Sequence, residues 1–244
     1  MSQKGSNIRN KKSGKNMTNQ NLVVDESHTK DGYFSARSNN SNKQKLRVIK
    51  DGYTLTYDIS NTFENFPLQL GNGQYQIQLY KNVSGRRYVP DGKIIINVSL
   101  QNELAPYLHS NQYVKYDNTS PYVQEALKYA GFSDSTKIKL IKEYISDNYI
   151  YDYVRSFLVE DGELPDIQRC FEKKMGICQD LAALTAAMFR TVGIPCQLVI
   201  GYTEKNQYHA WNEIYNGKVW EIFDPTMAVN NDKRNKKYSK ERWY

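Results

Sequence analysis

The chain has 244 residues, of which 39% are hydrophobic and 24% are charged, so it can build one large domain or two small ones. It contains no apolar run close to the ~20 residues of a membrane-spanning helix, and the sequence therefore predicts no transmembrane segment. The net charge of +7 is concentrated at the ends, with +5 in residues 1–24 and +4 in residues 232–244, which argues against a basic nucleic-acid-binding groove in the body of the protein.

The N-terminal region is polar and rich in Asn, Ser and Lys. This composition predicts a disordered basic tail over residues 1–29. The first residues are basic, but no apolar stretch follows them, so no complete signal peptide is visible. The sequence thus leaves two possibilities open: a cytoplasmic protein, or an exported protein whose exporting segment lies outside this sequence.

The next region has the two-residue period of β-strands. The stretch LRVIKDGYTLTYDI (46–59) contains two strands around Asp51-Gly52, a residue pair typical of tight hairpin turns. Two further strands are expected in YQIQLYKNV (75–83) and KIIINVSL (93–100). These patterns predict a small antiparallel β module over residues 30–118, which either binds a ligand or only supports the region that follows.

From Ser120 the period changes to that of helices. Helices are expected at 120–131, at 135–149 and from Cys178 to Val192, where Gly193 follows as a stop signal. Three strands are then expected at 195–203, 208–215 and 218–224. Helices followed by an antiparallel sheet define an α+β domain, which we place at residues 119–244.

The last two expected strands bring a histidine close to a carboxylate. A two-residue turn at Asn216-Gly217 would pair His209 directly with Asp224 across the strands. A carboxylate beside a histidine fixes its tautomer and stabilises its charged form. A strand histidine bonded for structural reasons, and an aspartate that merely starts a turn, are the alternatives.

Cys178 opens the third helix, and a helix N-terminus favours a thiolate. If that helix packs on the strands, Cys178, His209 and Asp224 could form a nucleophile, a base and an orienting carboxylate. The alternative is a small buried side chain, which is the commonest use of a free cysteine. The other cysteines, Cys170 and Cys196, lack metal-binding spacing, and we expect neither a disulfide framework nor a metal site.

Several short motifs in this region resemble one known family. The motifs are GICQDLAALTAAMFRTVGIP (176–195), VIGYT, YHAW and VWEIFDPT. They are similar, in order, to the core of the transglutaminase-like superfamily of papain-fold cysteine enzymes. The match is specific over about 165–228, and region 44–118 resembles the β module in front of bacterial members. The resemblance implies a papain-like core with Cys178 as nucleophile, His209 as base and acid, and Asp224 as orienting carboxylate.

The resemblance also implies a reaction, namely thiol attack on a protein or peptide amide with a thioester acyl-enzyme. Attack of an amine on this thioester would cross-link two molecules, whereas attack of water would result in cleavage or deamidation of the substrate. Trp211 is a candidate cleft wall, and Gln168 and Tyr151 are candidates for the second oxyanion donor. No cofactor is expected, and an extracellular or cell-surface location is favoured. A catalytically silent protein that binds through its β module is the alternative function.

Overall fold

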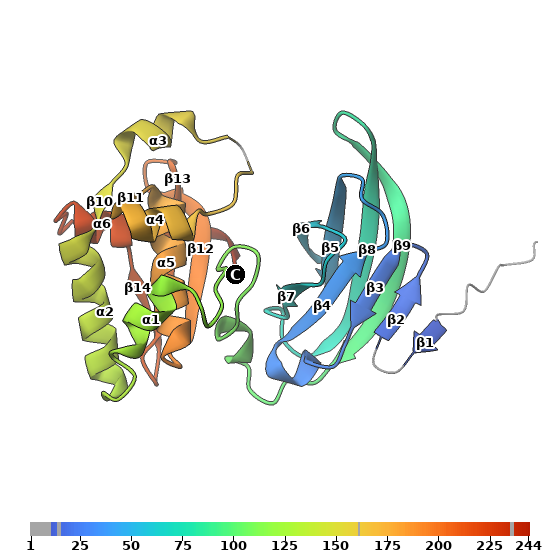
Figure 1. Ribbon diagram of the computed structural model, residues 1–244, viewed down its shortest axis with the longest axis horizontal. Coiled ribbons are helices and arrows are strands. Elements are labelled where there is room, and N and C mark those ends of the chain that lie inside the picture. Colours follow the sequence, from blue (N-terminus) through green and yellow to red (C-terminus); the bar gives the residue numbers. More distant parts are fainter. Residues whose placement is uncertain (1–10, 14–15, 161, 235–236) are drawn as a thin grey trace, which may run out of the picture. The chain divides into compact units, whose positions relative to one another are not determined.

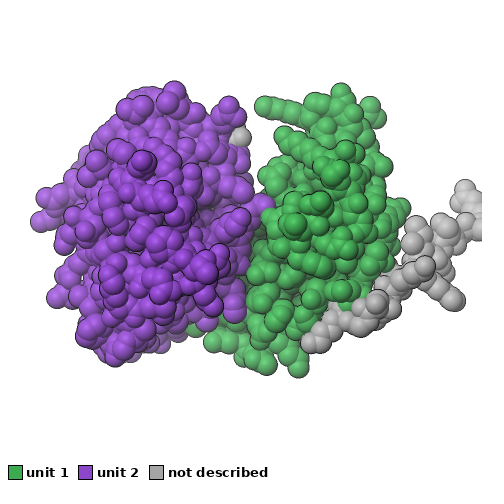
Figure 2. Space-filling view, viewed as in Figure 1, with its two compact units in different colours: residues 1–106 green, residues 107–244 purple. Residues whose placement is uncertain are grey.

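The computed structural model describes residues 11–13, 16–160, 162–234 and 237–244 (Figure 1). The chain divides into two compact units, residues 1–106 and 107–244, which Figure 2 colours separately. Residues 107–118 belong to the second unit, although the sequence suggested a boundary at 118/119. The reason is packing, because the ring of Tyr113 stacks on that of Tyr244 at 3.7 Å.

Within the described residues, unit 1 consists of two antiparallel sheets, the 3-10 turn η1 (Thr29–Asp31) and the start of a second 3-10 turn, η2 (Ala105–Tyr107). The sheet of order β1-β2-β3-β4-β7 contains β1 (Lys11–Ser13), β2 (Asn16–Asn19), β3 (Leu22–Asp25), β4 (Tyr33–Ser38) and β7 (Glu64–Pro67). The sheet of order β6-β5-β8-β9 contains β5 (Gln44–Lys50), β6 (Tyr53–Ile59), β8 (Gly73–Ser84) and β9 (Arg87–Val98). The expected antiparallel β module is therefore present.

Two features of unit 1 follow directly from the sequence pattern. Asp51 and Gly52 both have positive φ values, 48° and 82°, and connect β5 to β6 as the hairpin signal predicted. On β8 the alternate residues Tyr75, Ile77 and Leu79 are fully buried, as the two-residue period requires. One face of this sheet thus supplies core to unit 1.

The expected disordered tail is corrected by the structure where the structure describes it. Residues 11–13, 16–19 and 22–25 form strands β1, β2 and β3, and residues 1–10 and 14–15 of the predicted tail lie outside the described residues. Leu22 and Val24 are fully buried, because β3 pairs with both β2 and β4. Each strand has only four residues, too few to show a clear period among polar neighbours.

Unit 2 combines helices with a four-stranded antiparallel sheet of order β14-β13-β12-β15, which confirms the α+β class. Its sheet strands are β12 (Cys196–Thr203), β13 (Tyr208–Tyr215), β14 (Trp220–Phe223) and β15 (Tyr238–Trp243). Its helices are α1 (Pro121–Leu127), α2 (Asp134–Asn148), α3 (Tyr153–Leu158), α4 (Ile167–Lys173), α5 (Cys178–Thr191) and α6 (Pro225–Val229). Two short strands, β10 (Ile150–Tyr151) and β11 (Met175–Gly176), pair with each other. None of the helices in the described parts of the chain combines the length and apolar character needed to cross a bilayer.

Helix α5 is the centre of unit 2. Every residue from Asp180 to Arg190 is buried, and the helix packs against β12 and β13. Alanines at 182, 183, 186 and 187 let its backbone approach the sheet closely, so that the Asn212 side chain on β13 donates a hydrogen bond of 2.9 Å to the Ala182 carbonyl. Gly193 has a φ of 80°, as expected of the residue that ends the helix.

Arg190, near the end of α5, is buried and bonded entirely to backbone carbonyls. Its guanidinium donates to the carbonyl oxygens of Cys196 at 2.8 and 3.0 Å, of His109 at 2.7 Å and of Tyr244 at 2.6 Å. One side chain therefore connects the start of unit 2, the first sheet strand and the last residue of the chain.

Candidate active site

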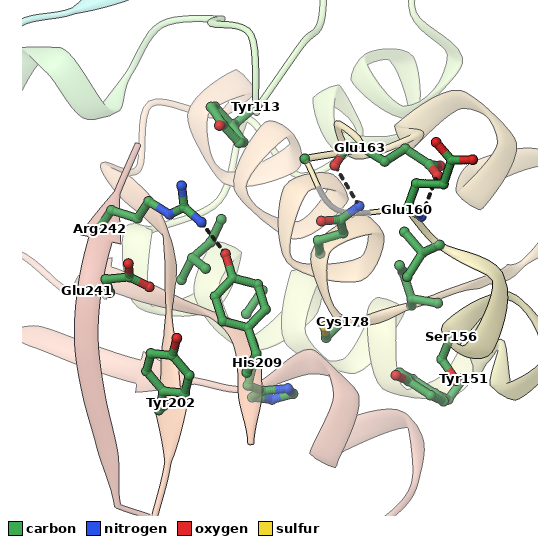
Figure 3. Close-up of a pocket in the computed structure, with 17 residues that line it drawn as sticks. Tyr113, Tyr151, Ser156, Glu160, Glu163, Cys178, Tyr202, His209, Glu241 and Arg242 are labelled. Atoms are coloured by element: carbon green, nitrogen blue, oxygen red, sulfur yellow. Dashed lines mark hydrogen bonds between the residues drawn. The ribbon is translucent and has the colours of Figure 1, made fainter. Parts of the chain in front are cut away.

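The N-terminus of α5 places Cys178 in the lining of a cavity of about 600 Å³ within unit 2. Figure 3 shows Cys178 beside His209, with Tyr151 and Ser156 on one side of the cavity and Tyr202 and Arg242 on the other. Cys178 is partly exposed, whereas Cys170 and Cys196 are fully buried, and all three are free thiols. Burial raises the pKa of Cys196 to about 12 and also raises the pKa of Cys170. Cys178 is thus the thiol that a substrate can reach.

His209 connects the thiol to a carboxylate. Its Nε2 atom lies 2.8 Å from Oδ2 of Asp224, and its ring lies beside Cys178 in the cavity. Because Asp224 occupies Nε2, the ring nitrogen available to the thiol is Nδ1. Burial by itself would lower the pKa of His209, but the interactions with Asp224 and Cys178 outweigh it and raise the pKa to about 9.

Asp224 is held as an anion. Its burial would raise its pKa, but the bond to His209, and then those from Tyr238 and the Met227 backbone, lower it overall. The side chain is 4% exposed, so the charge interaction with His209 is little weakened by solvent. A carboxylate is therefore bonded to an imidazole, and a thiol lies beside that imidazole in the same cavity.

The contact between His209 and Asp224 is present, but the predicted strand register is wrong. Strand β13 pairs with β14 so that Tyr215 lies opposite Trp220, because residues 216–219 form a four-residue loop. The register is thus shifted by two residues, and the paired part ends at Asn212 and Phe223. Asp224 follows as the N-cap of α6, and its side chain turns back to His209.

Two of the candidates named from sequence lie away from the cavity. Gln168 is exposed on α4, and its side-chain amide donates to Glu172 at 2.6 Å, so it is not an oxyanion donor in this structure. Trp211 is 1% exposed and stacks on Tyr238, with ring centroids 4.7 Å apart, so it is core and not a cleft wall. Both residues lie near site residues in the sequence, which suggested that they line the cavity. The sequence does not show the direction in which each side chain points.

Tyr151 does line the cavity next to Cys178. Burial, followed by the negative charge that Cys178 would carry, raises the pKa of Tyr151 to about 12. The phenol therefore keeps its proton and remains a hydrogen-bond donor at neutral pH. The backbone N–H of Cys178 lies in the first turn of α5, where a helix has no internal acceptor for it.

Asp180 and Gly176 shape the backbone around the nucleophile. The fully buried Asp180 carboxylate accepts from the backbone N–H groups of Ile177 at 3.2 Å and Asp166 at 2.9 Å, and Arg155 Nε lies 3.1 Å away. This cation compensates the negative charge of Asp180, which would otherwise disfavour a thiolate at Cys178, two residues away. A Cβ atom on Gly176 would lie 2.7 Å from Sγ of Cys170, so only glycine fits there.

Tyr238 is a site residue that the sequence analysis missed. Its hydroxyl donates to Oδ2 of Asp224 at 2.7 Å, from strand β15. Residues 232–244 were treated as part of a basic tail because six of the thirteen residues are Lys or Arg. The alternation of Tyr238, Lys240 and Arg242 was the available signal for a strand.

Comparison with known proteins identifies the family of this unit. The model of the transglutaminase-like superfamily matches residues 111–225, and these residues form a domain of that superfamily. The family that the sequence motifs resemble is thereby confirmed.

The matched relatives are distant or much longer than this chain. The uncharacterized protein YebA of Bacillus subtilis is 25% identical over 157 residues, which cover 55% of this chain and 21% of YebA. The uncharacterized protein ML0607 of Mycobacterium leprae is 37% identical over 65 residues, which cover 22% of this chain and 23% of that protein. This chain thus matches less than a quarter of either relative. The periplasmic domain of TgpA from Pseudomonas aeruginosa is 13% identical, with 80% of this chain and 93% of that chain covered and a TM-score of 0.43.

Proposed function

We propose that unit 2 is a cysteine acyltransferase or hydrolase that acts on protein or peptide amides. The observation that supports the proposal is that Cys178 and His209 line one cavity, where His209 lies 2.8 Å from Asp224. A binding module does not need a thiol, an imidazole and a carboxylate grouped in this way. An enzymatic function is therefore preferred to that of a catalytically silent binding protein.

In the first step the Cys178 sulfur attacks the carbonyl carbon of the amide. The C–S bond forms, the carbonyl oxygen takes up negative charge, and the Cys178 backbone N–H and the Tyr151 hydroxyl donate hydrogen bonds to it. His209, which carries the thiol proton, then gives a proton to the leaving nitrogen as the C–N bond breaks. The products of this step are an amine or ammonia and a thioester on Cys178.

In the second step a water molecule or an amine resolves the thioester. His209, now neutral, takes a proton from this nucleophile as it attacks, and the C–S bond breaks. Water yields a carboxylic acid, whereas an amine yields a new amide. Asp224 keeps the imidazole oriented and stabilises its charged form in both steps.

The test is capture of the acyl-enzyme by intact mass spectrometry. We expect a glutamine-containing peptide to add its acyl mass to the wild-type protein, and a primary amine to compete with water for that species. The Asp224→Asn variant should accumulate it at least a hundredfold more slowly, because the imidazole loses its charged partner. The proposal would be contradicted if the peptide binds but adds no covalent mass to the protein, either with or without an amine.

A further inference from the structure

The Asp224 carboxylate is held from all sides by groups of unit 2. Its Oδ1 atom accepts hydrogen bonds from the backbone N–H groups of Thr226 at 2.9 Å and Met227 at 3.2 Å. Its Oδ2 atom faces Nε2 of His209 at 2.8 Å and accepts the Tyr238 hydroxyl at 2.7 Å. Tyr238 and His209 therefore compete for one oxygen atom.

The position of Tyr238 is fixed by its strand and by its ring. Strand β15 pairs with β12 through an irregularity at Gly201, where an added Cβ atom would lie 2.0 Å from the Ser239 carbonyl oxygen. The Tyr238 ring stacks on Trp211 and lies nearly parallel to the His209 ring, with centroids 6.2 Å apart and a 14° interplanar angle. The hydroxyl also lies 3.1 Å from Sδ of Met227.

We propose that Tyr238 is a positioning residue for the acyl-transfer reaction, because its hydroxyl shares Oδ2 of Asp224 with His209 and sets how tightly the carboxylate holds the imidazole. This inference rests on the function proposed above for Cys178, His209 and Asp224. It assigns a fourth side chain to the reaction, one that does not itself touch the substrate.

The shared oxygen has a definite chemical consequence. When a carboxylate oxygen accepts two hydrogen bonds, each donor stabilises part of its negative charge. Each of the two hydrogen bonds is therefore weaker than a single one would be. Without the phenol hydroxyl, Oδ2 would serve His209 alone, and the imidazole would keep its proton to a higher pH. A histidine that releases its proton less readily is a weaker acid toward the leaving group and is neutral less often when a base is needed.

The test compares wild type with Tyr238→Phe, which removes the hydroxyl and keeps the stacked ring. The chain has three histidines, so the His209 ring signals can be assigned and titrated by NMR. We expect the His209 titration to move up by roughly half a pH unit or more. We also expect kcat to fall about tenfold with KM unchanged, since the substrate does not contact Tyr238.

Tyr122→Phe is the matched control. Tyr122 is also buried in unit 2 and donates a hydrogen bond of 2.8 Å, but to the Lys115 backbone carbonyl and not to a site residue. Its loss should leave the His209 titration unchanged. An unchanged titration in Tyr238→Phe as well would overturn the proposal, as would a fall in kcat that Tyr122→Phe reproduces. The titration needs no turnover, so an inactive wild type would defeat the proposed function while the role of Tyr238 could still be decided.

Discussion

Replacing Cys178 with alanine will abolish turnover while leaving unit 2 folded. The expected loss is roughly 10⁴-fold or more in kcat, because without the sulfur no acyl-enzyme can form and only binding and oxyanion stabilisation remain. Alanine is well tolerated at the first position of a helix, and the partly exposed Cys178 side chain contributes little to the core. The measurement is release of product from an amide peptide, together with the circular dichroism of the variant.

The matched control is Cys196→Ala. Cys196 is fully buried on β12 and is absent from the described lining of the cavity, so the variant should retain turnover per folded molecule despite some loss of stability. Full activity in Cys178→Ala would show that another group is the nucleophile. Equal losses in both variants would show that the effect of Cys178 is structural.

Replacing Arg190 with methionine should be the most destabilising single change in unit 2. Methionine fills similar space but leaves three backbone carbonyls without the donors that now bond them at 2.6 to 3.0 Å. Loss of a buried charged donor of this kind costs about 3 kcal/mol or more in the free energy of unfolding. All three tryptophans, at 211, 220 and 243, belong to unit 2, so their fluorescence during urea unfolding reports on this unit alone.

Arg234→Met is the control for that change. Arg234 is largely exposed and forms a surface ion pair with Asp232, so its replacement should leave the urea midpoint unchanged. A midpoint for Arg190→Met within error of the wild type would contradict the role of the buried guanidinium. It would mean that the carbonyls of His109, Cys196 and Tyr244 find other donors.

Much of unit 2 could be predicted because its signals are local. Helix α5 begins at Cys178 and is followed by Gly193 as predicted, since capping and the left-handed stop residue are properties of a few adjacent residues. The meeting of His209 with Asp224 was also predicted, but through a register that the four-residue loop at 216–219 excludes. The contact depends instead on the turn from β14 into α6, where Asp224 is the N-cap. The pairing of strands does not predict the direction of a side chain in that turn.

The missed features depend on partners that are distant in the sequence. Strands β2 and β3 are stabilised by pairing along a sheet whose members extend to β7, and short polar strands carry no clear period of their own. Tyr238 lies in a basic segment and becomes part of the site only because β15 pairs with β12. Trp211 shares a strand with His209, yet its ring packs against Tyr238 and is excluded from the cavity.

The most direct measurement is site-resolved alkylation of the folded protein with limiting iodoacetamide from pH 5 to 9. Because Cys178 is partly exposed and lies beside His209, whose pKa is raised to about 9, we expect Cys178 to be alkylated selectively, while the buried Cys170 and Cys196 are not. In His209→Ala the alkylation of Cys178 should be slower at neutral pH, because the neighbouring positive charge is lost. If Cys178 reacts no earlier than the other two cysteines, or if His209→Ala leaves its pH profile unchanged, the thiol and the imidazole are not a catalytic pair.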